Sequence, residues 1–300
     1  MKFRVSHKTS YKYSTDVSSC YNLAVMTPKS FHGQELLESS LHIDPKPDSK
    51  NISQRQDFFG NKVTRFALHE VHKSLEVEVI SIVNRNFDQV HQSYSSPQCT
   101  NVTLAQAKDI MSQPLLSFED LDAKQYVLDS TFIKGISEDI KNYAKQSLKL
   151  NRSLFEGVEE LVHRIFTDFT FSSGVTNIST PINEVMRMKK GVCQDFAQFA
   201  IACIRSLGIP ARYVSGYIET LPPEGEEKLV GVDASHAWFA VYIPSFGWVE
   251  FDPTNNQIPL NQHIVVGWGR DYYDLPPMKG IVYTSGKSKM KVAVDIQRIS

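Results

Sequence analysis

The feature that most constrains this chain is a predicted helix between Gly191 and Gly208 that is apolar over most of its surface. Five apolar side chains recur at helical spacing and share one face: Phe196, Phe199, Ala200, Cys203 and Leu207. Such a helix must be covered by other elements on nearly every side, so we expect it at the centre of a domain. Gly208 and Pro210 predict where it ends.

Cys193 falls in the first turn of this helix. Unpaired backbone N–H groups and the positive end of the helix dipole favour an anion there, and a thiolate is the form of cysteine that attacks a carbonyl carbon. The same N–H groups can receive a tetrahedral oxyanion. We therefore interpret Cys193 as a nucleophile and Cys203, which lies deeper in the helix, as a packing residue.

A β-hairpin with a four-residue turn is predicted over residues 235–253. If Tyr242 pairs with Trp248, the constant sum of paired numbers makes His236 a diagonal neighbour of Asp252 on the same face. Diagonal Cα atoms lie about 7–8 Å apart, which lets an imidazole and a carboxylate meet. The hairpin thus predicts a histidine–aspartate pair.

These residues supply the parts of a thiol acyl-transfer site. His236 would take the proton of the Cys193 thiol and later protonate the leaving amine, and Asp252 would orient the imidazole. Asp195 and Asp233 are rival acids. We interpret Asp195 as a first-turn carboxylate favoured by the helix dipole, and Asp233 as part of a polar loop.

Two domains are predicted from the length of 300 residues and from the change of pattern along the chain. Residues 1–95 alternate polar and apolar positions, as expected of an all-β domain. A polar stretch from about 84 to 114 is interpreted as the linker, and helical spacing follows, with Ser153 as an N-cap. The second domain, residues 96–300, holds the candidate site.

The charge balance excludes several classes of function. Lys plus Arg is 32 and Asp plus Glu is 33, so the formal net charge is −1, and we expect no nucleic-acid partner and no membrane partner.

The four cysteines form no CxxC pair, so a zinc ribbon is not indicated. Because the N-terminus has no apolar region typical of a signal peptide, we expect a cytoplasmic protein.

Three motifs carry a resemblance to a known family: Gly191-Val192-Cys193-Gln194-Asp195, Ser235-His236-Ala237-Trp238 and Gly247-Trp248-Val249-Glu250-Phe251-Asp252-Pro253-Thr254. They resemble the core of the bacterial transglutaminase-like superfamily, which includes proposed cysteine proteases. The opening Thr9-x-Tyr11-x-Tyr13 and the turn at 57–61 resemble the β domain that precedes this core.

The resemblance implies an α+β fold. Its papain-like core packs a cysteine-bearing central helix on an antiparallel sheet, after an N-terminal β-sandwich-like domain. It implies Cys193 as nucleophile, His236 as base and Asp252 as the orienting acid, with a peptide or protein substrate and with no metal and no organic cofactor. Related enzymes complete the oxyanion hole with an upstream Gln or Trp. Between Thr131 and Val192 the chain has no Trp and one Gln, Gln146, so the Cys193 N–H is the donor that we predict.

Three functions fit these residues. The first is a cysteine-dependent hydrolase that cleaves an amide or peptide bond through a thioester. The second is a protein-glutamine gamma-glutamyltransferase, in which an amine rather than water resolves the same thioester. The third is a non-catalytic peptide-binding protein. The polar stretch 220–233, just before His236, is either a mobile flap over the site or an exposed loop.

Overall fold

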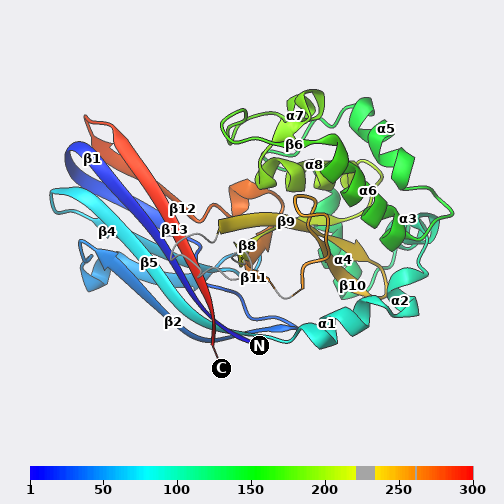
Figure 1. Cartoon of the computed structure of the whole chain (residues 1–300), viewed down its shortest axis with the longest axis horizontal. Coiled ribbons are helices and arrows are strands. Elements are labelled where there is room, and N and C mark those ends of the chain that lie inside the picture. Colours follow the sequence, from blue (N-terminus) through cyan, green and yellow to red (C-terminus); the bar gives the residue numbers. More distant parts are fainter. Residues whose placement is uncertain (221–233, 261, 300) are drawn as a thin grey trace, which may run out of the picture.

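The computed structural model describes residues 1–220, 234–260 and 262–299, without the side chains of residues 87–89, 91 and 234. Within these residues an elongated β domain lies beside a second sheet that is surrounded by most of the helices (Figure 1). The predicted α+β fold, a β domain followed by a helix-and-sheet core, is confirmed. No helix in the described ranges is long and apolar enough to cross a membrane.

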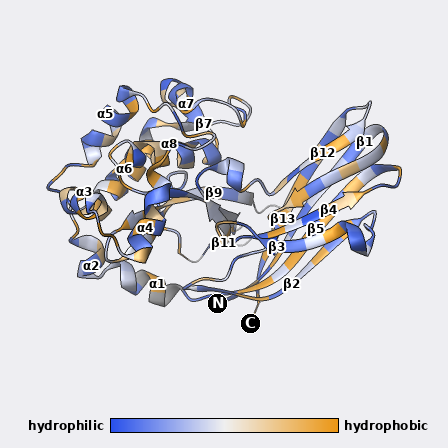
Figure 2. Cartoon of the chain, turned by 180° about the vertical axis from the view of Figure 1, so that it is seen from behind, coloured by the Kyte–Doolittle hydropathy of each residue, from blue (hydrophilic) through white to orange (hydrophobic). Residues whose placement is uncertain are grey.

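The first sheet is built around one very long strand, β1. Its members are β1 (Lys2–Ala24), β2 (Gln34–Asp44), β3 (Ile52–Gln56), β4 (Lys62–Leu68), β5 (His72–Arg85), β12 (Met278–Thr284) and β13 (Ser288–Ile299). The first half of β1 pairs with β5 and β13, and its second half pairs with β4 and β12, all antiparallel. Polar and apolar residues alternate along these strands (Figure 2), because successive side chains point to opposite faces.

The last two strands of the chain return to this first sheet. Lys2 pairs with Ile299, so the two ends of the chain lie together (Figure 1). The predicted division into 1–95 and 96–300 did not anticipate this return, since β12 and β13 come from the second segment and lie in the sheet of the first. Pairing between the two ends of a chain cannot be predicted from the local residue pattern of either strand.

The stretch predicted as a linker is largely helical, which corrects that prediction. It contains α1 (Phe87–Tyr94), α2 (Pro97–Thr100) and α3 (Leu104–Ser112). At the start of α3 the Thr103 hydroxyl accepts the Gln106 N–H, and the Gln106 side chain accepts the Thr103 N–H. This capping box satisfies backbone groups in a segment whose polar composition suggested a loop.

The second sheet has the order β10-β9-β8-β11, and the remaining helices lie mainly around it. The strands are β8 (Ala211–Ile218), β9 (Ala234–Ile243), β10 (Gly247–Phe251) and β11 (His263–Gly269). The helices are α4 (Phe118–Lys124), α5 (Glu138–Ser147), α6 (Leu154–Asp168), α7 (Ile182–Met188) and α8 (Cys193–Arg205). Two short parallel strands, β6 (Thr170–Phe171) and β7 (Lys190–Gly191), lead into α8.

Helix α8 is the central element of this part of the fold, as predicted. It packs against β8 and β9 on one side and against α5, α6 and α7 on the others. Every residue from Asp195 to Arg205 is buried. Gly208 follows the helix with φ +83°, a conformation that glycine adopts without strain and that stops the helix from continuing.

The predicted hairpin register is also present. Trp248 on β10 pairs with Tyr242 on β9, and the ladder runs on to the pair of Phe251 with Phe239. Asp252 follows directly and forms an isolated bridge with Gln257. This register places the end of β10 beside the beginning of β9, where His236 lies.

Candidate active site

Cys193 is the first residue of α8, and it differs from the other cysteines in its exposure. Cys20, Cys99 and Cys203 are buried, whereas Cys193 is partly exposed; all four are free thiols. The residue before the helix, Val192, has an extended backbone (φ −115°, ψ 179°), so the helical conformation begins at Cys193 itself. The fold thus places one accessible sulfur at a helix N-terminus.

Asp195 closes the first turn of α8 rather than serving the histidine. Its Oδ2 accepts the Val192 N–H at 2.8 Å and the Thr176 hydroxyl at 2.7 Å. Burial raises the pKa of the Asp195 carboxyl, while these two hydrogen bonds oppose the shift. A Cβ on Gly191 would lie 2.5 Å from Asp195 Oδ2, so this cap requires glycine at that position. The first-turn interpretation of Asp195 is confirmed.

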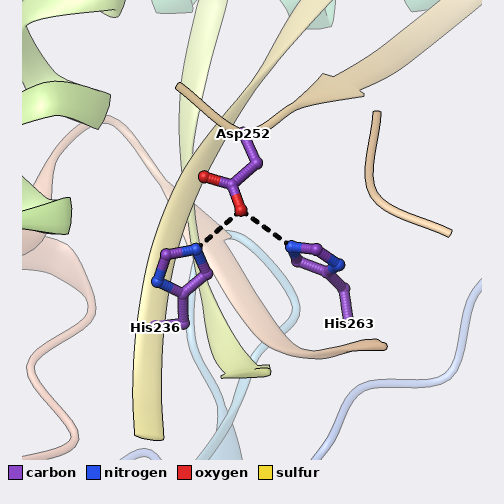
Figure 3. Close-up of side chains that lie close together, drawn as sticks. All are labelled: His236, Asp252 and His263. Carbon is purple, nitrogen blue, oxygen red and sulfur yellow. Dashed lines mark hydrogen bonds and ion pairs between the residues drawn. The ribbon is translucent and has the colours of Figure 1, made fainter. Parts of the chain in front are cut away.

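His236 and Asp252 meet at the buried end of the hairpin. The His236 Nε2 donates to Asp252 Oδ2 at 2.8 Å, and both side chains are buried (Figure 3). The histidine comes from the start of β9 and the aspartate from the end of β10, so the two-strand register alone brings them together.

The Asp252 carboxylate is held by more donors than His236 alone. Its Oδ2 also accepts the His263 Nε2–H at 3.0 Å and the Asn255 side-chain amide at 2.7 Å. Its Oδ1 accepts the backbone N–H groups of Thr254 at 2.9 Å and Asn255 at 3.3 Å. Burial would raise the pKa of Asp252, but the two histidines hold it well below its usual range. The carboxylate is therefore ionised and fixed in orientation.

His263 is the member of this cluster that the sequence did not reveal. It begins β11, which is separated from β9 by β8, and Figure 3 shows it approaching Asp252 from the side opposite His236. Gly216 on β8 lies between the two strands, and a Cβ there would lie 2.6 Å from the Trp238 ring. No motif surrounds His263, so only the sheet order could have identified it.

The two histidines differ in protonation. Burial would lower the pKa of His236, but hydrogen bonds with Asp252 and Cys193, together with their charges, raise it to about 10. Burial lowers the pKa of His263, with Asp252 only opposing the shift. The His263 Nδ1 is buried without a hydrogen-bond partner in the described ranges, so the ring proton lies on Nε2. Near neutral pH His236 is thus an imidazolium and His263 a neutral donor.

The same three residues are the one group, among those described, compact enough to suggest a metal site. One donor atom each from His236, Asp252 and His263 lies within 4.8 Å of the others. A metal ion needs lone pairs from both imidazoles, whereas here both Nε2 atoms sit at hydrogen-bond distance from the same carboxylate oxygen. The arrangement fits a shared hydrogen-bond acceptor better than a ligand set.

Three further sequence predictions have different outcomes. The stretch 220–233, predicted to be a flap or a loop, lies outside the described residues except for its first residue, and so does Asp233. Gln146 accepts a hydrogen bond from Arg164 at 2.6 Å on the surface of α5, so the side chain is engaged away from Cys193. The Cys193 backbone N–H at the start of α8 stays the one oxyanion donor that we predict.

Two family models match the chain. Residues 3–84 match the bacterial transglutaminase-like N-terminal region, and residues 141–253 match the transglutaminase-like superfamily. The second match contains Cys193, His236 and Asp252.

Similar proteins cover either nearly the whole chain or a short part of it. An uncharacterised protein of Mycobacterium tuberculosis is 38% identical over 301 residues, covering 98% of this chain and 92% of its own. A protein-glutamine gamma-glutamyltransferase of Pseudomonas aeruginosa is 38% identical over 72 residues, which are 24% of this chain and 11% of that enzyme. The crystal structure of a proposed cysteine protease from Cytophaga hutchinsonii superimposes with a TM-score of 0.74 and 22% identity, covering 99% of this chain and 90% of that one.

Proposed function

Because this chain belongs to the transglutaminase-like superfamily, we propose that it is a thiol hydrolase that cleaves an amide bond of a peptide or protein through a thioester. The observation that carries the proposal is the buried His236–Asp252 bond of 2.8 Å beside the accessible Cys193. A partly exposed sulfur, a helix N-terminus and an imidazolium are the groups that activate a thiol.

The first half of the reaction forms the acyl-enzyme. The Cys193 Sγ attacks the carbonyl carbon as a thiolate stabilised by the neighbouring imidazolium, and the Cys193 N–H receives the oxyanion. Because His236 Nε2 is bonded to Asp252, Nδ1 is the ring nitrogen left to exchange a proton with the reacting groups. It protonates the leaving nitrogen as the C–N bond breaks, which leaves a thioester and a neutral imidazole.

The second half consumes water. Neutral His236 takes a proton from the water molecule as its oxygen bonds to the thioester carbon. The C–S bond then breaks, releasing a carboxylic acid and restoring the thiolate–imidazolium pair. Asp252 stays ionised throughout, stabilises the imidazolium and keeps the Nε2 proton in place.

His263 acts in this proposal as a positioning residue. Its neutral Nε2–H anchors the Asp252 oxygen that also receives His236, so the carboxylate cannot rotate away when the imidazole loses its charge. The support is the geometry: two donors at 2.8 and 3.0 Å on one oxygen, with three further donors around the carboxylate.

A gamma-glutamyltransferase is the second candidate. The observation that favours it is the 72-residue segment shared with the Pseudomonas aeruginosa enzyme of that name. Both reactions pass through the same thioester and differ in whether water or an amine resolves it. Incubating the protein with a glutamine-containing peptide and dansylcadaverine distinguishes them: dansyl incorporation supports transfer, and peptide cleavage without incorporation supports hydrolysis.

The proposal is tested by alkylation of the four thiols. Iodoacetamide is applied from about pH 5 to about pH 9, and the label is mapped by mass spectrometry in the wild type and in His236→Ala. We expect fast labelling of Cys193 below neutral pH in the wild type and slow labelling in the variant. The three buried cysteines are internal controls. Equal, slow labelling of Cys193 in both proteins would contradict the nucleophile assignment.

A further inference from the structure

A cavity lies against the second sheet, apart from the candidate active site. Its volume is about 450 Å³, and it is enclosed by β8, β10 and β11, by α1 and by the segment around Phe31. Most of the walls are apolar, and five Phe, Tyr and Trp rings line it: Phe31, Tyr94, Phe246, Trp248 and Trp268. Neither Cys193 nor His236 belongs to this lining, so the cavity is separate from the candidate active site.

Arg212 is the unusual group in this cavity. Its guanidinium lies between two indole rings, 4.2 Å from the centre of Trp248 and 3.9 Å from the centre of Trp268. The residue is only 7% exposed. Both flat faces of the cation are therefore covered by aromatic rings, and its edge is left for a hydrogen-bond acceptor.

No acceptor fills that edge within the described part of the chain. The Arg212 Nε is buried without a hydrogen-bond partner among the described residues. Burial lowers the pKa of Arg212 to about 10, which expresses the cost of keeping the charge there. A buried arginine is normally paired, because its five N–H donors lose their water on burial.

The nearby carboxylate forms no direct ion pair with Arg212, although its charge opposes the effect of burial on the Arg212 pKa. Glu250 lines the cavity, but its Oε2 accepts the Trp238 indole N–H at 2.8 Å. The described lining holds two arginines and this one carboxylate, and one of the arginines, Arg85, also donates to the Gln34 side-chain oxygen at 3.3 Å. A hydroxyl is also present, since the Tyr94 oxygen accepts the Glu250 N–H at 3.5 Å and keeps its own proton to donate. The cavity thus offers positive charge and donors within aromatic walls.

We propose that this cavity binds a small organic carboxylate with an apolar body, and that the carboxylate pairs with the free edge of Arg212. The planar guanidinium fork matches a carboxylate in a two-bond arrangement. The indole and phenyl rings would cover the apolar body, as in ligand pockets that combine apolar walls with a few placed polar groups. Inorganic phosphate satisfies the charge but leaves the aromatic walls uncovered.

The test measures binding directly and does not depend on catalysis. The probe is 3-phenylpropionate, titrated against the wild-type protein and followed by tryptophan fluorescence, since two of the three tryptophans flank Arg212. We expect saturable binding, at least about tenfold weaker binding of the uncharged 3-phenylpropanol and of inorganic phosphate, and no change after alkylation of Cys193. Equal affinity for acid and alcohol, equal affinity for phosphate, or loss of binding on alkylation would overturn the proposal.

Two further measurements locate the site. Arg212→Lys keeps the charge but not the planar fork, and we expect it to weaken 3-phenylpropionate at least about tenfold, with circular dichroism as the folding control. If that variant does not fold, the wild type labelled with the photoreactive 4-benzoylbenzoate answers the question. Crosslinks at residues 90–94, 246–250 or 268 support the site, and crosslinks confined to other segments contradict it.

Discussion

Among the described residues, Cys20 lies against His72 and Cys193 against His236, and the surroundings of these two pairs differ. In the β domain the Cys20 Sγ lies 3.7 Å from the His72 Nε2. In the second sheet His236 interacts with Cys193 at the start of α8. Both pairs bring a thiol to an imidazole, so the proximity of these groups does not distinguish a catalytic site.

The partner of each imidazole makes the first difference. The His72 Nδ1–H donates to the Glu70 backbone carbonyl at 2.7 Å, and its Nε2 faces the Cys20 Sγ. His236 instead donates to the Asp252 carboxylate, which stabilises an imidazolium. A neutral carbonyl stabilises a positive ring less than a carboxylate does, so His72 lacks the kind of partner that raises the pKa of His236.

The surroundings of each sulfur make the second difference. Cys20 is completely buried within the β domain, and burial raises the pKa of its thiol, although the Asn22 amide at 3.2 Å opposes the shift. Cys193 is partly exposed at a helix N-terminus. A reactive cysteine therefore needs an anion-stabilising backbone and access as well as a histidine.

The largest expected effect comes from removing each sulfur in turn. Cys193→Ala should lower amide cleavage at least about 10⁴-fold, because the covalent step is lost. Cys20→Ala should leave kcat/KM within about twofold, because the β-domain pair touches no reacting group. Initial rates on a fluorogenic peptide measure both. A large loss of activity in Cys20→Ala, with an unchanged circular dichroism spectrum, would remove the distinction between the pairs.

Asp252→Asn gives His236 a neutral hydrogen-bond acceptor, as the Glu70 carbonyl is for His72. The amide cannot stabilise the imidazolium, so kcat should fall about 10³- to 10⁴-fold. The alkaline limb of kcat/KM reports the His236 proton needed by the leaving amine. It should lie near pH 10 in the wild type, where the His236 pKa is about 10, and at least about 1 pH unit lower in the variant. An unshifted limb would mean that Asp252 does not control His236.

Variants of His263 test whether the Asp252 carboxylate needs a second histidine donor to hold its orientation. His263→Phe removes the donor to Asp252, and we expect kcat to fall about 10- to 100-fold with little change in KM. His263→Gln keeps an N–H donor and should recover most of the activity. The alkaline limb should rise in His263→Phe, because Asp252 then serves His236 without a competing donor. A merely structural role would change stability without moving this limb.

The sequence predicted the parts of the site that depend on local pattern. The first turn of a helix identified Cys193, and a two-strand register identified His236 and Asp252 as neighbours. These elements form over short separations, where propensity, capping and turn residues suffice. The α+β fold with its N-terminal β domain was predicted from the family motifs and is confirmed.

The parts that were missed depend on contacts between distant segments. His263 reaches Asp252 only because β11 pairs with β8, which in turn pairs with β9. The return of β13 to β1 joins the two ends of the chain. The helices α1 to α3 were missed for another reason, since their polar composition resembles that of a linker and only α3 carries a capping box. Strand order is set by packing of the whole domain, which no window of sequence contains.

The charged pair should also affect stability in a defined pH range. The folded-state pKa of His236, about 10, lies above its ordinary value of 6.5, so folding favours the protonated ring. The stabilisation is complete below about pH 6.5 and is lost as the pH rises towards 10. The wild-type Tm should therefore fall more between these limits than that of Asp252→Asn, as calorimetry would show. Parallel Tm curves for the two proteins would contradict the imidazolium assignment.

The smallest effect is expected at the structural pair. Cys20→Ala removes the sulfur that contacts His72 Nε2 and leaves a small void in the β domain, so the free energy of unfolding should fall by about 1–2 kcal/mol. Cys20→Ser keeps a hydroxyl that can donate to the same nitrogen, and it separates the hydrogen bond from the packing. Urea denaturation followed by circular dichroism measures both. A loss in Cys20→Ala that Cys20→Ser fully restores would assign the pair to hydrogen bonding, and equal losses would assign it to packing.

In either case alkylation of Cys193 should proceed at the wild-type rate, because the two pairs share no residue. A changed rate would show that the β domain takes part in activating the catalytic thiol.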